Sequence, residues 1–70
     1  MHLVEMGGCQ VLRLRPGLFI WVDEDATWEE VREIEWVHAT ARIVLGRSPN
    51  ERVIIRQAWA TCMVAEEVMD

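Results

Sequence analysis

A chain of 70 residues in which 51% are apolar has more hydrophobic surface than so small a body easily hides. A domain of this length buries only about 60% of the surface that its unfolded chain exposes, so its own core contributes little stability. Small domains compensate with disulfides, a bound metal or oligomerisation. We therefore expect residues 1–70 to form one small domain that completes its core against another chain.

A disulfide or a bound metal is less well supported by this sequence than oligomerisation as a source of additional stability. Cys9 and Cys62 allow one disulfide at most, and the N-terminus has neither the basic start nor the apolar run of a secretory signal. We expect a reducing, cytoplasmic location in which both thiols act as small apolar residues. His2 and His38 add no metal-ligand spacing to the cysteines. No apolar run reaches the roughly 20 residues that cross a bilayer. Oligomerisation remains, and we expect no cofactor and no membrane.

The first third of the chain has the pattern of short strands. Runs rich in Leu, Val, Ile, Phe and Trp cover about residues 2–6, 9–15 and 18–23. Gly7-Gly8 and Pro16-Gly17 separate these runs, and both pairs are turn signals. The sequence predicts a three-stranded antiparallel meander.

The remainder has helical signals. Thr27 and Glu30 have the spacing of a capping box, and Gly46 can supply a left-handed stop, which predicts a helix over about residues 28–45. A second helix is predicted over about residues 49–69, and the short link makes the two helices an antiparallel hairpin. The expected fold class is α+β, with the element order βββαα.

The second predicted helix is apolar on almost every side when it is plotted at 100° per residue. One neighbouring helix and one small sheet cannot cover it, so we expect a homodimer or a subunit of a protein complex. On the first helix, Trp36 lies opposite the core stripe, whereas Trp21 is expected in the core. The predicted interface residues are Trp36, Ile43, Ile55, Trp59 and Met63.

Residues 23–35 contain seven acids and one base, in a chain of net charge −5. Acids at a helix start complement the helix dipole, which is one explanation. The other is a docking surface for a basic partner, such as a protein that handles nucleic acid. An acidic chain argues against direct nucleic-acid binding. The predicted docking acids are Asp23, Glu24, Asp25, Glu29, Glu30 and Glu33.

Catalytic motifs are weak. His38 and Cys62 would approach each other across a helical hairpin and could act as base and nucleophile, but we interpret them as core residues. The sequence contains no Gly-rich phosphate loop and no nucleophile elbow. We predict that the chain is not an enzyme.

Two functions remain. The first is a small acidic protein-binding module that self-associates and binds or regulates another macromolecule. The alternative is a phage-type inhibitor, similar in size and charge to an anti-CRISPR or an antitoxin, that blocks a basic nucleic-acid-binding surface by charge mimicry.

Overall fold

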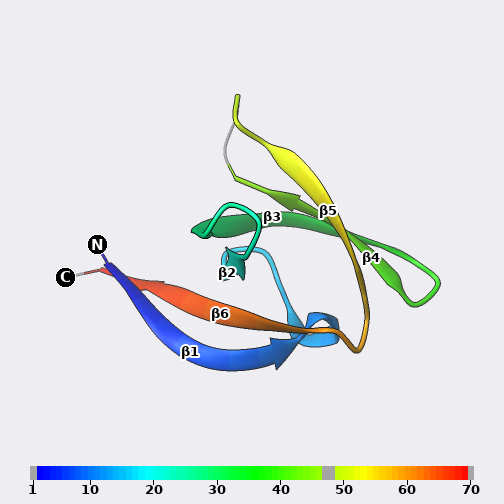
Figure 1. Ribbon diagram of the computed structural model, residues 1–70, viewed down its shortest axis with the longest axis horizontal. Helices are drawn as coiled ribbons and strands as arrows, with labels where there is room; N and C mark the ends of the chain where they lie inside the picture. Colours follow the sequence, from blue (N-terminus) through cyan, green and yellow to red (C-terminus); the bar gives the residue numbers. More distant parts are fainter. Residues whose placement is uncertain (1, 47–48, 70) are drawn as a thin grey trace.

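Antiparallel β-structure makes up nearly the whole chain (Figure 1). The computed structural model describes residues 2–46 and 49–69, and within them there is no α-helix. The elements are β1 (His2–Gln10), a 3-10 turn η1 (Val11–Arg13), β2 (Phe19–Val22), β3 (Thr27–Val37), β4 (Thr40–Leu45), β5 (Arg52–Gln57) and β6 (Thr61–Val68).

The six strands form one sheet in the order β1-β6-β2-β3-β4-β5, and every pairing is antiparallel. Strands β2 to β5 follow one another as consecutive hairpins, and β6 returns to lie between β1 and β2. The start of β1 and the end of β6 are therefore neighbours, with His2 opposite Val68 (Figure 1).

The long strand β3 allows the sheet to bend. Its first part pairs with β2 and its second part with β4, and a bulge between Val31 and Glu33 separates the two parts. Bulges bend a strand and increase its local twist. In Figure 1, β1 and β6 run along the lower left of the view, whereas β4 and β5 run steeply at the upper right. The core lies between these two halves and contains Val11, Leu14, Ile20, Val22, Val31, Ala41, Ile43, Leu45 and Val64.

The prediction of a helix over residues 28–45 is wrong, because this segment is the β3–β4 hairpin. The bulge puts an extra residue between the inward-facing Val31 and Ile34, which gives them the three-residue spacing of a helix face. His38, with a φ of 56°, makes the turn together with Ala39. Neither residue is a strong turn former, so the turn was invisible in the sequence.

The second predicted helix, over residues 49–69, is also wrong. It is replaced by β5, a turn and β6. Val53, Ile54 and Ile55 are β-branched residues, which favour strands. They alternate between the exposed face and the core side of β5. This alternation explains why the segment appeared apolar on every side when plotted as a helix.

The N-terminal meander is wrong in its pairing, although part of it is confirmed. Gly7-Gly8 makes no hairpin turn: β1 continues through it with a bulge between Glu5 and Gly7, and pairs with β6. Gly7 has a φ of 95°, which glycine adopts without strain. The turn at Pro16-Gly17 and the strand after it are confirmed by the turn assignment there and by β2. The fold is therefore all-β and not α+β.

Candidate functional site

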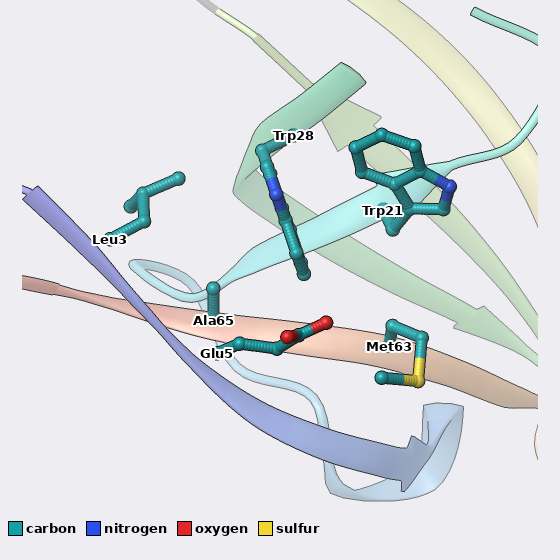
Figure 2. A pocket seen from close by; sticks show the side chains of 6 residues that line it. All are labelled: Leu3, Glu5, Trp21, Trp28, Met63 and Ala65. Carbon is teal, nitrogen blue, oxygen red and sulfur yellow. The ribbon is translucent and has the colours of Figure 1, made fainter. Parts of the chain in front are cut away.

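The outer face of β1, β6, β2 and β3 carries a cleft of about 460 Å³ (Figure 2). We call it the tryptophan cleft. Its lining consists of two indoles, one carboxylate, one thioether and two small or aliphatic side chains. The residues are Leu3, Glu5, Trp21, Trp28, Met63 and Ala65.

Strand alternation places the two indoles in this cleft. Ile20 and Val22 point into the core from β2, so Trp21 between them points outward. Trp28 lies directly opposite Trp21 in the β2–β3 register, and direct partners share a face. The ring centroids are 5.4 Å apart and the rings are inclined at 67°. The two indoles therefore form the sides of a corner.

The other walls come from β1 and β6. Val64 is buried in the core, so its neighbours Met63 and Ala65 face the opposite way and line the cleft. Ala65 is fully buried, and Glu5 on β1 lies opposite it in the register. In Figure 2 the Glu5 carboxylate extends toward Met63, below the two indole rings.

Among the described residues that line the cleft, Glu5 alone carries a formal charge. Among residues 2–46 and 49–69, its carboxylate takes part in no hydrogen bond or ion pair. Glu67 lies opposite Leu3 in the β1–β6 register and adds a second acid at the same end of the face. The cleft therefore combines aromatic walls with uncompensated negative charge.

A second, smaller hollow of about 250 Å³ adjoins the tryptophan cleft and shares Trp21 and Met63 with it. Cys62 lines it and lies opposite Cys9 on β1, and its Sγ donates to the Cys9 carbonyl oxygen at 3.4 Å. Burial raises the pKa of the Cys62 thiol, and the Cys9 thiol raises it further, whereas Arg56 lowers it. A raised pKa keeps the thiol protonated and makes it a poor nucleophile.

No group of three or more potential metal ligands occurs within the described part of the chain. His38 lies in the β3–β4 turn, while Cys62 lies on β6. The described residues also contain no helix long and apolar enough to span a membrane.

The predicted interface residues do not form one surface. Ile43 is fully buried in the chain's own core. Trp36 lies near the end of β3 and is 41% exposed, Ile55 faces outward from β5, and Trp59 is 61% exposed in the β5–β6 turn. Of the five, Met63 alone lines the tryptophan cleft.

The predicted docking acids lie on the β2–β3 hairpin and not at a helix start, so the helix-dipole explanation no longer applies. Two of them are matched by arginines of β5: Glu24 pairs with Arg56 at 3.5 Å, and Asp25 pairs with Arg52. On β3 itself, Arg32 donates to Glu30 at 3.3 Å.

Three acids of that set are not ion-paired to an arginine in the described structure. Glu29 accepts a long hydrogen bond from the Thr27 hydroxyl at 3.5 Å, while Asp23 and Glu33 are exposed. Half of the acidic set is thus neutralised within the chain. Charge mimicry by this segment stays a prediction, with less free charge to support it.

Sequence reasoning missed most of the tryptophan cleft, including Leu3 and Glu5, and placed Trp21 in the core. The signal was present in the β2–β3 hairpin. Residues 23–26 are short polar or small residues between two apolar runs, which is a turn pattern. A hairpin there sets Trp21 opposite Trp28.

Comparison with protein-family models, with curated proteins and with solved structures finds no match for this chain.

Proposed function

We propose that this protein is a non-enzymatic binding module that takes up a cationic side chain of a partner protein in the tryptophan cleft. One observation carries the proposal: the Trp21–Trp28 corner faces a carboxylate that has no partner among the described residues. The indole pair also stabilises the β2–β3 hairpin as a cross-strand contact, but the Glu5 carboxylate forms no hydrogen bond or ion pair with the described residues.

Indole faces attract cations through the ring quadrupole. Such contacts contribute about 0.5–1 kcal/mol at exposed sites and about 2 kcal/mol when the cation is desolvated. Trp21 and Trp28 are both half-buried, so their rings are held in place by packing and still reach the solvent. Tryptophan is also the residue type most enriched among interface hot spots.

Electrostatics on a larger scale support the same kind of partner. The net charge of −5 attracts a basic protein over roughly the Debye length, which is about 8 Å at physiological ionic strength. Glu5 places part of this charge in the same cleft as the indoles. Binding is therefore expected to weaken as salt is added.

The proposal includes self-association through β5. This strand is the last in the sheet order, and Val53 and Ile55 are exposed on its outer side. An edge strand with apolar side chains on its exposed face is a template for pairing with another chain, and the charges of β5 lie on its core side, where Arg52 and Arg56 pair with Asp25 and Glu24. Two copies of β5 can pair antiparallel about a two-fold axis, which is the commonest symmetry of homodimers.

Peptide titration tests the binding function. A capped peptide with three Lys or Arg residues should quench or shift tryptophan fluorescence, and a matched peptide with Glu at those positions should not. Trp28→Ala should reduce the affinity at least about tenfold, as loss of a hot-spot residue does. Trp59→Ala removes an exposed indole outside the cleft and should leave the affinity unchanged. Equal loss in both variants, or equal binding of both peptides, would reject the proposed function.

Light scattering tests self-association. The wild-type chain should give twice 8.1 kDa at micromolar concentration. Ile55→Lys should return the protein to the monomer with its β-sheet circular dichroism intact, because the new charge protects the edge strand. A wild-type monomer at these concentrations contradicts this part of the proposal.

A further inference from the structure

We propose that the preferred occupant of the tryptophan cleft is a methylated lysine of the partner protein, and specifically its dimethylated, tertiary ammonium form. This inference rests on the proposed function, and it names the chemical class of side chain that the cleft selects. The argument uses the number of acceptors in the cleft, the angle between the indoles and the charge of the lining.

The number of acceptors disfavours unmodified lysine. A lysine ammonium has three N–H donors and is strongly hydrated. The side chains that line the cleft present one carboxylate, from Glu5, while Trp21, Trp28, Met63 and the aliphatic residues offer no strong acceptor. An unmodified ammonium would therefore lose water that the lining does not replace. A dimethylated ammonium keeps a single N–H, which one carboxylate satisfies.

The angle between the indoles disfavours arginine. A guanidinium is planar and gains most when it stacks flat on an aromatic face. Because the Trp21 and Trp28 rings are inclined at 67°, a plane that stacks on one ring meets the other nearly edge-on. A tetrahedral head group directs its methyl groups to several sides at once, so it can contact both indole faces of the corner.

The other side chains that line the cleft can pack against the methyl groups of a methylated ammonium ion, which carry part of its positive charge. Met63 contributes a polarisable thioether, and Leu3 an aliphatic side chain. Methylation spreads the positive charge over these methyl groups, and aromatic cages for quaternary ammonium ligands use the same attraction. Glu5, with Glu67 at the same end of the face, supplies the opposite charge.

A peptide series tests this inference. Capped Gly/Ser peptides carry one central residue: lysine, monomethyl-, dimethyl- or trimethyl-lysine, arginine, or a neutral isostere in which carbon replaces the ammonium nitrogen. Dimethyl-lysine should bind at least about tenfold more tightly than lysine, arginine and the neutral isostere. The inference is overturned if lysine or arginine binds as tightly as dimethyl-lysine, or if the neutral isostere does.

Two controls make the result specific. Glu5→Leu removes both the charge and the hydrogen-bond acceptor at about the same side-chain size, and it should abolish the preference for dimethyl- over trimethyl-lysine. Trp28→Phe keeps an aromatic face if Trp28→Ala fails to fold, and it should lower the affinity for every methylated peptide. An unchanged ranking in Glu5→Leu also counts against the inference.

The failure of this inference differs from the failure of the proposed function. If the peptide with three Lys or Arg residues binds in a Trp28-dependent way while methylation has no effect, the inference is lost and the binding function stands. If no cationic peptide binds, both are lost.

Discussion

Two acidic regions of this molecule differ in what surrounds their carboxylates. The β2–β3 hairpin holds most of the negative charge, yet Glu24 and Asp25 pair with arginines of β5 and Glu30 pairs with Arg32. The tryptophan cleft holds the single carboxylate of Glu5, which has no such partner within the described structure and faces two indoles. The density of acids along the sequence therefore does not indicate which carboxylates lack a partner in the fold. The cleft is the proposed site because its carboxylate is unpaired within the described residues and lies beside two indoles.

The pairing of the hairpin acids has a structural role instead. Arg52 and Arg56 lie on the core side of β5, where they share a face with Leu45 and Ala41 of β4. The turn at residues 23–26 reaches across to them, so its acids connect β5 to the β2–β3 hairpin. The charges of this region therefore link β5 to the hairpin, whereas the Glu5 carboxylate has no such partner within the described residues.

Matched charge reversals should give the largest effect. Glu5→Lys places a cation where the partner's cation would lie, and it should weaken binding of the basic peptide by more than about tenfold. Glu33→Lys makes the same charge change on an exposed residue of β3 outside the cleft lining, and it should leave the affinity within about twofold. Calorimetric titration at fixed salt compares them. Equal weakening by both variants would mean that net charge, and not the cleft, determines binding.

The Asp25–Arg52 pair should produce a smaller, purely structural effect. Within the described residues, Arg52 Nε and Nη2 are buried without a hydrogen-bond partner. Asp25→Ala leaves that guanidinium uncompensated and should lower the free energy of unfolding by up to about 1 kcal/mol, since both side chains are partly exposed. Arg52→Met should cost less, because it removes the unsatisfied nitrogens as well. Urea denaturation measures both, and the reverse order would contradict this role. Neither variant should change peptide affinity.

The sequence predicted local features better than pairing. The Pro16-Gly17 turn and the strand that follows it were recognisable, because proline and glycine have direct conformational signals. Gly46 was correctly assigned a positive φ, which is 85°, although it follows β4 and not a helix. The pairing of β1 with β6 joins residues some 60 positions apart, as His2 and Val68 show, and no local pattern encodes it.

The candidate site could not be predicted from the sequence for the same reason, because it depends on long-range strand pairing. Glu5, Trp28 and Met63 come from three strands, and only the antiparallel register brings them together. The bulge after Val31 also shifted the strand period toward that of a helix, which hid the β3–β4 hairpin. Residues 31–44 contain five β-branched residues besides Thr40, and this composition was a sign of strand that outweighs the capping-box spacing in this segment.

The smallest expected effect concerns pH and the Cys62 thiol beside the cleft. Burial raises its pKa above the usual value of 9.0. Because the folded pKa exceeds the unfolded one, the protonated thiol contributes its full stability below pH 9 and loses it as the pH rises through the folded pKa. The chain has no Tyr or Lys to titrate in the same range. Wild-type stability should therefore fall above pH 9 relative to that of Cys62→Ala. Parallel pH profiles of the two proteins would contradict this expectation.

The four tryptophans allow the most direct test of the cleft as the binding site. Each indole Nε1–H gives its own signal in a ¹H–¹⁵N correlation spectrum, assignable by single substitutions. Titration with the dimethyl-lysine peptide should shift the signals of Trp21 and Trp28 and leave those of Trp36 and Trp59 in place. Saturable shifts at Trp36 or Trp59, with Trp21 and Trp28 unmoved, would contradict the assignment of the site.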